Sequence, residues 1–467
     1  MAESRQNVAS AADPVAKEPS ILPGASANLL ELDDIQSGVL RPRPSPYVAT
    51  YILLRIDDRK AGRELMRKLS TVVASCGHLT SPAGDAWVSV SLTFQGLKAL
   101  GVPQDSLNSF PPEFQQGMAA RAKELGDTEE SAPQNWEKPL GTPDVHVALT
   151  ALSPTEQQLE PVLERARKAY QEMQGIKAIW RQDCYASADG KEPFGFRDGI
   201  SHPAVEGSGI PGTNPKEQPL KAGEFVLGYK DETGGYPSMP QPDALGRNGT
   251  YVVFRKLHQR VAAFRQYLKA NSSGPEEEEL LGAKMMGRWR SGAPLALCPV
   301  RDNPELGADR KRNNDFLFQD ADPKGFVTPP GSHIRRMNPR DTLGDRTIVN
   351  LHRMIRRGTN YGPSLPEGVL EDDGMDRGLM FVFVGAYLRR QFEFVQSEWV
   401  NSGLFVGSKD EKDPIAGAND GSNRFTVPRH PVRRALLNLP RFVVTRGGEY
   451  SFMPGIRAIR WLAELDG

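Results

Sequence analysis

The stretch that decides the fold is YVATYILLRIDDRKAGRELMRKLSTVV, residues 47–73. Its first ten residues are mostly β-branched, aromatic or aliphatic, which predicts a buried strand. From residue 57 the hydrophobic period changes, and Leu65, Leu69 and Val72 fall on one helical face. A buried strand followed at once by an amphipathic helix predicts the first half of a β-α-β unit.

The segments that follow complete this unit. WVSVSLT (87–93) alternates like a strand, and DVHVALTAL (144–152) predicts another. Residues 154–173 predict a helix with Ser153 as its N-cap, and residues 175–185 predict a fourth strand. The order β-α-β-β-α-β is typical of a ferredoxin-like domain, an antiparallel sheet with helices on one face.

The second half repeats this order less regularly. Strands are predicted at 224–229, 249–255, 347–354, 378–385 and 442–452, and helices at 261–268, 276–289, 391–399 and 456–465. We therefore expect an α+β protein with two ferredoxin-like domains, in which antiparallel sheets carry packed helices. The expected divisions are a flexible N-terminal arm (1–45), a first domain (46–215) and a second domain (216–467).

Composition narrows the class of protein. The 467 residues carry 58 Lys and Arg against 58 Asp and Glu, so no net field draws the chain to nucleic acid or membrane. Three cysteines without a Cys-x-x-Cys pair disfavour zinc ribbons and covalently attached haem, and fit a reducing compartment. The first twenty residues lack the apolar core of a secretory signal, and no run of about 18 apolar residues occurs. We expect a cytoplasmic protein whose oligomeric state is open.

Two polar stretches stand out as candidate sites. Residues 331–362, GSHIRRMNPRDTLGDRTIVNLHRMIRRGTNYG, hold seven arginines against two aspartates, together with His333 and His352. Such a cluster needs an anionic partner or solvent, so it is either a metal-binding histidine with anion-binding neighbours or a basic surface. The second stretch is EPFGFRDGISHP (192–203), which alone predicts a tight turn around Asp198.

Other motifs give no support to further classes of enzyme. Residues 207–212 match Gly-x-Gly-x-x-Gly, but the TNPKEQP that follows cannot open a helix, so dinucleotide binding is rejected. The sequence contains no P-loop, no His-Glu-x-x-His and no Gly-x-Ser-x-Gly. His202 is expected to be a structural hydrogen-bonding residue.

Taken together, the two polar stretches resemble the dye-decolorizing peroxidase family. The family's Gly-x-x-Asp-Gly motif is present as residues 195–199, and its proximal-histidine segment as SHIRRMNPR with His333. Its distal-arginine segment is present as IRRGTNYG, with Arg357 before Gly358, and RGLMFVFVGAYLRRQFEFVQSEWVN (377–401) also matches. The resemblance covers about residues 45–460. It implies two ferredoxin-like domains, haem mainly in the C-terminal half, and a longer-chain, intracellular bacterial member.

The resemblance also implies a cofactor and residue roles. Haem b would be held non-covalently, with His333 as the proximal ligand of its iron and Asp413, or else Glu393, as the carboxylate behind that histidine. Asp198 would carry the proton and Arg357, in preference to its neighbour Arg356, would stabilise the departing oxygen. The remaining roles would fall to Arg340 for the haem propionates, with Arg335 and Arg356 as alternatives, and to Leu379 and Phe381 as an apolar distal roof.

The resemblance implies peroxidase activity. Hydrogen peroxide would oxidise haem to a ferryl species, and bulky aromatic dyes or phenols, with Mn(II) as an open addition, would return it in one-electron steps. Electrons from bulky substrates would pass through an aromatic residue near the surface, with Trp399, Tyr361 and Tyr450 as candidates. Because an Asp of pKa about 3.9 stays ionised in acid, we expect an optimum below neutral pH.

Two other functions remain open at this point. The same His333 could ligate haem in a haem-binding or iron-handling protein whose peroxidase activity is incidental. Alternatively, residues 331–357 could form a basic patch that binds nucleic acid.

Overall fold

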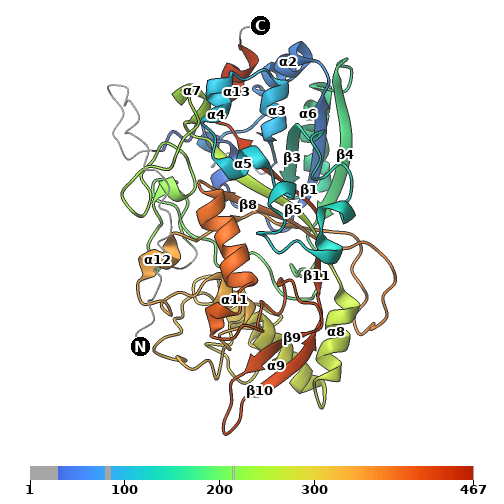
Figure 1. Cartoon of the computed structure of the whole chain (residues 1–467), viewed down its shortest axis with the longest axis vertical. Helices are drawn as coiled ribbons and strands as arrows, with labels where there is room; N and C mark the ends of the chain where they lie inside the picture. The colour runs from blue at the N-terminus through green and yellow to red at the C-terminus, as the bar shows by residue number, and fades with distance from the viewer. Residues whose placement is uncertain (1–29, 79–85, 213, 215, 466–467) are drawn as a thin grey trace, which may run out of the picture.

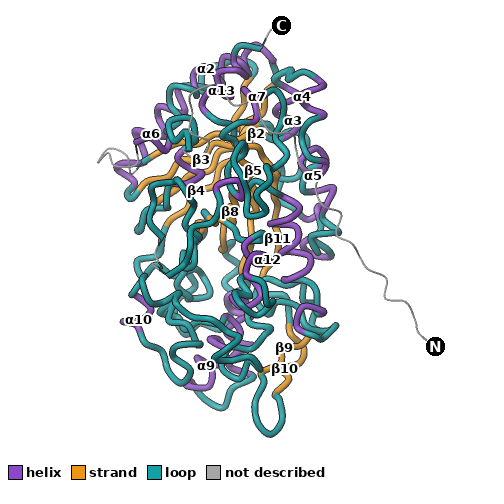
Figure 2. Tube along the Cα trace, turned by 90° about the vertical axis from the view of Figure 1, so that its left-hand side faces the viewer, coloured by secondary structure: helices purple, strands orange, loops and turns teal. Residues whose placement is uncertain are grey.

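The computed structural model describes residues 30–78, 86–212, 214 and 216–465. Within this part of the chain, nine strands form one sheet in the order β5-β11-β2-β3-β1-β4-β7-β8-β6. Strand β5 also pairs with β8, so the sheet closes into a ring at the centre of the molecule (Figures 1 and 2). These strands are β1 (Val48–Ile56), β2 (Trp87–Leu92), β3 (Val147–Ser153), β4 (Ile176–Tyr185), β5 (Thr250–Gln259), β6 (Ile355–Arg356), β7 (Thr359–Tyr361), β8 (Gly378–Gly385) and β11 (Val443–Met453).

The first four strands have the order β2-β3-β1-β4, with all neighbours antiparallel. The fourth strand lies beside the first, as in a ferredoxin-like unit. Between them run α2 (Arg59–Leu69), capped by the Asp58 carboxylate, and α6 (Glu156–Lys168). Thr155 caps α6, so the predicted N-cap at Ser153 is wrong by two residues, and Ser153 ends β3.

The second half repeats the same order as β11-β5-β8 with β6 and β7. Here α8 (Val261–Ala270) follows the first strand, and residues 388–400 precede the last. The prediction of an α+β protein with two ferredoxin-like halves is confirmed. The strands of both halves join one ring, through β11 with β2 and β4 with β7, so the domain boundary at residues 215 and 216 stays a prediction.

Three details of the second half differ from prediction. Residues 224–229 form no strand, and residues 347–354 contain the short helix α12 (Arg346–Asn350) instead of one. Residues 391–399 are helical as predicted, but lie in two π-helical turns, Leu388–Glu393 and Val395–Val400. Wide π turns often occur at functional sites, where they shift side chains out of the α-helical register.

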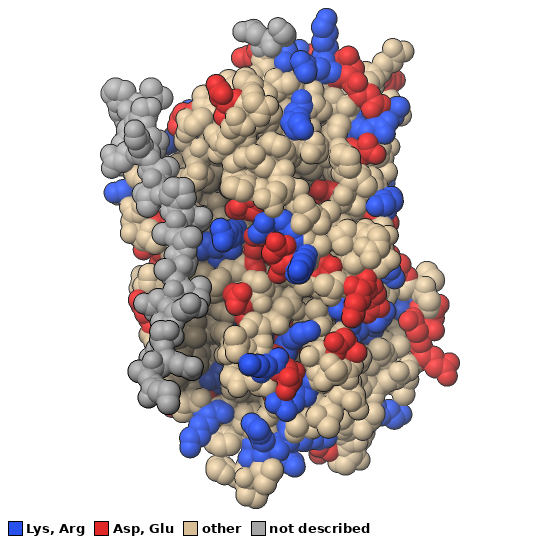
Figure 3. Space-filling view, viewed as in Figure 1, with Lys and Arg blue, Asp and Glu red and all other residues tan. Residues whose placement is uncertain are grey.

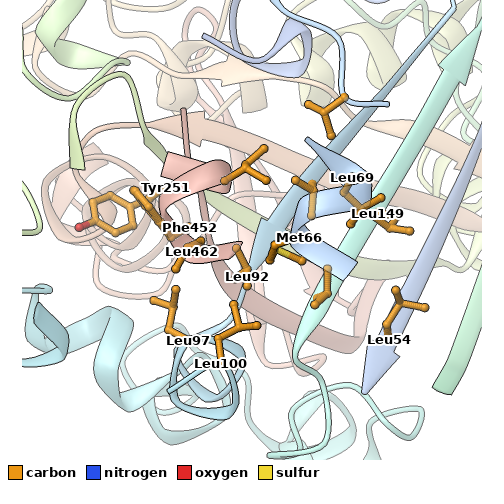
Figure 4. Packing of buried hydrophobic residues seen from close by; sticks show 14 of the residues in the cluster. Leu54, Met66, Leu69, Leu92, Leu97, Leu100, Leu149, Tyr251, Phe452 and Leu462 are labelled. Atoms are coloured by element: carbon orange, nitrogen blue, oxygen red, sulfur yellow. The ribbon is translucent and has the colours of Figure 1, made fainter. Parts of the chain in front are cut away.

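Helices α2 and α13 (Ile456–Ala463) lie at the top of the molecule in Figure 1, and Figure 4 shows Met66 of α2 and Leu462 of α13 in one cluster of buried side chains. They pack against Leu149, Tyr251 and Phe452 from three strands, and all five side chains are nearly inaccessible to solvent. Burying one such side chain contributes about 1.5–3 kcal/mol. This core makes the upper end of the ring a rigid support for the loops below it.

The remaining helices and strands are short or peripheral. They are α1 (Ser37–Leu40), α3 (Phe94–Ala99), α4 (Gln104–Asn108), α5 (Pro112–Gln116), α7 (Asp243–Gly246), α9 (Pro275–Met286), α10 (Pro304–Ala308), α11 (His333–Met337), β9 (Asn423–Val427) and β10 (Arg434–Leu439). No helix in the described ranges has both the length and the apolar character needed to cross a membrane.

The predicted flexible arm is wrong for residues 30–45, which are part of the folded body. Ile35, Val39 and Leu40 are buried. Gln36 is completely buried and its side chain bonds to Val90 on β2 and to the Pro454 carbonyl. Residues 1–29 of the arm lie outside the described residues. The segment therefore braces both halves, and it brings Arg43 toward the candidate site.

Candidate functional site

A mostly apolar cavity lies where the loops of the two halves meet. Its lining includes Asp198, His333, Arg340, Leu379 and Phe381, all of which the sequence singled out. Asp198 comes from the loop after β4, His333 from α11, and the last two from β8. These residues lie up to 183 positions apart in the chain, and the fold brings them to one space.

His333 is oriented by a buried carboxylate. Its Nδ1 lies 2.8 Å from Oδ2 of Asp413, whose side chain is completely buried. A carboxylate at Nδ1 accepts the proton there, which leaves the lone pair of Nε2 as the metal-binding position. The sequence-based choice of Asp413 over Glu393 agrees with this geometry, because Glu393 instead pairs with Arg121 and accepts a bond from the Tyr450 hydroxyl.

Asp413 is itself held in place. Its Oδ1 accepts hydrogen bonds of 2.8 Å from the backbone N–H groups of Ile415 and Ala416. Burial opposes ionisation of this carboxyl, but His333, Arg336 and these donors outweigh burial and hold its pKa below the ordinary value. Both oxygens of Asp413 thus have fixed partners, so the His333 ring cannot swing freely.

Asp198 faces the cavity as an ionised carboxylate. Burial raises its pKa, but the charges of Arg43 and then Arg356, the Gly199 N–H and His333 together leave the pKa below the usual value. Oδ2 of Asp198 lies 3.7 Å from Nη2 of Arg43. Sequence reasoning missed Arg43, because the residue lies in a segment that was expected to be flexible.

Of the neighbouring arginines 356 and 357, the structure places Arg356 in the cavity and not the predicted Arg357. Arg356 is paired with Phe383 across β6 and β8, so both side chains share the sheet face that carries Phe381. Successive residues of a strand point to opposite faces, which turns Arg357 away. Arg357 donates to the carbonyls of Val39 and Leu40 at 3.2 and 3.1 Å. The predicted effect of Arg357 on Asp198 is therefore exerted by Arg43 and Arg356.

Two buried guanidinium groups give one part of the cavity lining positive charge. Arg340 donates to the carbonyls of Asn314 and Phe316, and Arg288 donates to those of Gly292 and Asn313. Burial lowers the pKa of each to about 9, so both remain cations at neutral pH. Because the carbonyl groups that accept these hydrogen bonds are neutral, the positive charges of the two arginines favour an anionic ligand in the cavity. Arg335, the alternative for this role, is not in the lining.

In the charged stretch 331–362, every arginine except Arg346 is buried or only partly exposed. Arg335, Arg336 and Arg353 are 2%, 0% and 8% exposed. On the face shown in Figure 3 acidic and basic side chains are interspersed. A nucleic-acid-binding patch needs exposed lysine or arginine side chains, so the basic-patch hypothesis for these residues is wrong.

Several other predicted roles are changed by burial. Trp399, Tyr361 and Tyr450 are 3%, 2% and 1% exposed, so none of the three candidates for electron transfer is exposed at the surface. His202 is buried among arginines, and its Nδ1 has no hydrogen-bond partner. Burial, reinforced by these positive charges, holds its pKa well below the usual range, so the ring is neutral. Within the described residues no group of three His, Cys, Asp or Glu side chains could hold a further metal ion.

The residues present fit haem. One histidine with a fixed Nδ1 proton supplies an axial ligand, and apolar side chains such as Leu379, Phe381 and Ile334 line the walls. Two buried cations suit the anionic propionates. Asp198 and Arg356 line the same cavity as His333.

The chain is similar to several characterised proteins, although no family model matches it. It is 32% identical to a dye-decolorizing peroxidase of Exidia glandulosa, over 92% of this chain and 86% of that protein. It is also 32% identical to one of Auricularia auricula-judae, over 93% and 87%. A multifunctional dye peroxidase of the bacterium Amycolatopsis is 30% identical, over 92% and 96%. A shorter match, 29% identical over 39% of this chain, joins it to an Escherichia coli deferrochelatase.

Solved structures agree with the sequence comparisons. An ancestral D-type dye decolorizing peroxidase superposes with a TM-score of 0.81 at 30% identity, over 92% of this chain and 99% of that one. A dye-decolorizing peroxidase in complex with 2,6-dimethoxyphenol has a TM-score of 0.81 at 28% identity, over 93% and 100%. The relatives at the highest identities are fungal, so the expected bacterial origin is not supported by them.

Proposed function

Because the chain belongs to the dye-decolorizing peroxidase family, we propose that its cavity binds haem b through His333 and reduces hydrogen peroxide with electrons from aromatic dyes. One observation carries the proposal: a histidine oriented by a buried carboxylate shares one cavity with an ionised aspartate and an arginine. The histidine and its carboxylate would supply the ligand to haem iron, and the aspartate and arginine would supply acid–base catalysis and charge stabilisation for peroxide.

Each residue has a distinct task in this proposal. Bound haem supplies the redox chemistry, and His333 holds its iron. Asp198 takes a proton from one oxygen of peroxide and returns it to the other, which turns the departing oxygen into water. Arg356 stabilises negative charge on that oxygen, and Arg340 with Arg288 binds the propionates. Leu379 and Phe381 keep water out of the cavity.

We extend the proposal to phenols as reductants and to one-electron steps through a ferryl intermediate. The solved relative that is in complex with 2,6-dimethoxyphenol supports the phenols. Mn(II) stays an open addition to these reductants. The three unpaired cysteines, two of them buried, fit the cytoplasm as the site of action.

A haem-handling function is the second candidate, and the short match to a deferrochelatase supports it. Such a protein needs the haem ligand but has no use for a proton carrier and a cation beside it. Asp198, ionised and held by Arg43, and Arg356 in the same lining therefore favour the enzyme.

The test is to follow peroxide binding to the purified, haem-loaded protein by stopped-flow absorbance. The wild type should show a Soret band that disappears in His333→Ala, and a rapid spectral change with peroxide. In Asp198→Asn the second-order rate constant should fall by about 100-fold or more, because a positioned proton carrier contributes that much. A Soret band with equally slow peroxide reactions in both proteins would favour haem handling instead.

A further inference from the structure

Two carboxyl groups besides Asp198 line the cavity: Asp127, which is paired with Arg255, and Glu192, which has no role in the proposed reaction. Glu192 lines the same cavity as Asp198, six residues before it on the same loop. The negative charge of Asp198 opposes ionisation of Glu192 and so raises the pKa of the Glu192 carboxyl group. The cavity therefore contains two carboxyl groups that interact.

The backbone of its own loop holds Glu192 in position. Oε1 accepts a hydrogen bond of 3.0 Å from the Phe196 N–H, and Oε2 accepts one of 3.0 Å from the Phe194 N–H. The side-chain amide of Gln259, from β5, donates to Oε2 at 2.7 Å. Gln259 also lines the cavity. The carboxyl group is thus fixed at the wall and cannot swing out to solvent without breaking three bonds.

The charges around Glu192 are few. On its own loop the acting charge is Asp198, and the adjacent Lys191 pairs with Asp189 on the outer side. From the segment after α9, Arg290 donates to the Phe194 carbonyl but is paired with Glu279. Gln259, the contact from β5, is neutral. Glu192 therefore has three hydrogen-bond donors but no cation of its own, unlike Asp198 with Arg43 and Arg356.

This difference separates the two carboxyl groups in pKa. Burial raises the pKa of Glu192 to about 7 despite its three donors, whereas the arginines keep the pKa of Asp198 below its ordinary value. At mildly acidic pH one group is a protonated acid and the other is an ionised base. Pairs of titratable groups whose environments push their pKa values apart mark acid and base roles.

The proposed reaction needs such an acid. Reducing one hydrogen peroxide to two waters takes two electrons and two protons, and Asp198 only moves a proton between the two peroxide oxygens. A phenol inside the cavity brings a proton with each electron. A reductant too large to enter, or one without a proton to give, supplies only the electron, so both protons must come through the protein.

We propose that Glu192 is a second proton carrier, which delivers to the cavity the protons that accompany electrons from proton-free or bulky reductants. Each delivery leaves Glu192 as the carboxylate, which its three donors stabilise. Reloading takes place from the outer side of the loop, where Lys191 reaches solvent. The inference rests on the proposed function and adds a proton route to it.

The test compares two electron donors in Glu192→Gln after peroxide has been added to the haem-loaded protein. Ferrocyanide gives an electron without a proton, and phenol gives both. The quantity compared is the rate with ferrocyanide divided by the rate with phenol. At pH 5 this ratio should be about 100-fold lower in the variant than in the wild type. In the wild type the ferrocyanide rate should fall about tenfold per pH unit above pH 7, and this dependence should vanish in the variant.

A second variant and a direct measurement guard against misfolding. Gln259→Met removes one donor from the Glu192 carboxylate, so the transition near pH 7 should move to higher pH. In infrared difference spectra of the resting haem-loaded protein, a protonated-carboxyl band should titrate near pH 7 and be missing from Glu192→Gln.

The outcomes separate this inference from the proposed function. Equal losses with ferrocyanide and phenol, an unchanged transition near pH 7, or no infrared band would overturn the role of Glu192. Failure of the proposed function would appear earlier, as a wild-type protein without a Soret band or without a rapid reaction with peroxide.

Discussion

Asp198 shows how a few charges decide what one partly buried carboxyl group can do. Burial disfavours its ionised form, which is the form that takes a proton from peroxide. The charge of Arg43, 3.7 Å away, is the largest influence that lowers its pKa, and Arg356 follows. Arg43 comes from a segment before β1, more than 150 residues from Asp198 in the chain.

The first prediction concerns Arg43. Asp198 has a depressed pKa in the folded protein, so its base function persists as the pH falls and is lost only near that low pKa. Arg43→Leu should raise the pKa of Asp198 and move the acid limb of the peroxide rate constant to higher pH. Stopped-flow measurements across pH 3–7 check this, with the surface variant Arg55→Leu as a control that should leave the limb in place. An unmoved limb in Arg43→Leu would contradict the assigned cause.

The second prediction concerns the carboxylate behind His333. Asp413→Asn keeps the size of the side chain but removes the negative charge that faces Nδ1 of His333. The ligand becomes a weaker electron donor, so the reduction potential of the iron should rise and activity should fall by about 10- to 100-fold. Spectroelectrochemical titration of the haem-loaded variant measures the potential, and Glu411→Gln, on the same loop, serves as the comparison. A potential equal to that of the wild type would remove Asp413 from this role.

At the scale of the element, the short strand β6 determines which arginine enters the cavity. The register of β6 with β8 places Ile355 opposite Val384 and Arg356 opposite Phe383. Pairing with β8 therefore determines which side chains of β6 point to each face of the sheet. The sequence shows two adjacent arginines before Gly358 but does not show the phase of a two-residue strand. That phase comes from a pairing with residues almost thirty positions away, and it explains why Arg357 was chosen wrongly.

The third prediction uses this pair as its own control. Arg356→Ala should lower the rate constant with peroxide by about 100-fold or more, because it removes a cation aimed at the departing oxygen. Arg357→Ala should leave that rate close to wild type in folded protein. It should instead lower the free energy of unfolding by about 1–3 kcal/mol, since the carbonyls of Val39 and Leu40 lose their buried donor. Stopped-flow and urea titration measure the two effects, and a reversed pattern would restore Arg357.

Residues with a local signature were predictable from the sequence, and the rest were not. His333, Asp198, Arg340, Leu379 and Phe381 lie in motifs of consecutive residues, and the structure brings all five to one cavity. Arg43 and Arg288 have no such signature, because only the tertiary fold places them there. Glu192 lies in the polar stretch 192–203, but no motif assigned it a role. Residues 347–354 were predicted as a strand from their β-branched content, but Asp345 caps a short helix there.

At the scale of the molecule, the strand order was predictable because alternation and helix periodicity are local. The unpredicted part is the closure of two halves into one ring, which depends on contacts between distant edges such as Leu92 with Phe452. The packing of residues 30–45 was missed for the same reason. Half of these residues are polar, and hydrogen bonds to β2, to Pro454 and to the start of α13 hold them.

The fourth prediction tests this brace. Gln36 bonds to both the N–H and the carbonyl of Val90 and to the carbonyl of Pro454, within a completely buried setting. Gln36→Ala leaves those groups without partners and should lower the free energy of unfolding by about 1–3 kcal/mol or more. Urea titrations followed by circular dichroism measure it. The exposed Gln104→Ala should change stability by less than about 0.5 kcal/mol, and an equal effect of both would contradict the brace.

The place of β11 in the ring has a consequence for biosynthesis. It is the last of the described strands in chain order, yet it lies between β5 and β2 and contributes Val443 and Thr445 to the cavity wall. Until those residues leave the exit tunnel the ring stays open, and residues 30–45 have no Pro454 carbonyl to hold. Such long-range pairings form slowly. A chain stalled before residue 443 therefore has no finished cavity in which to retain the cofactor.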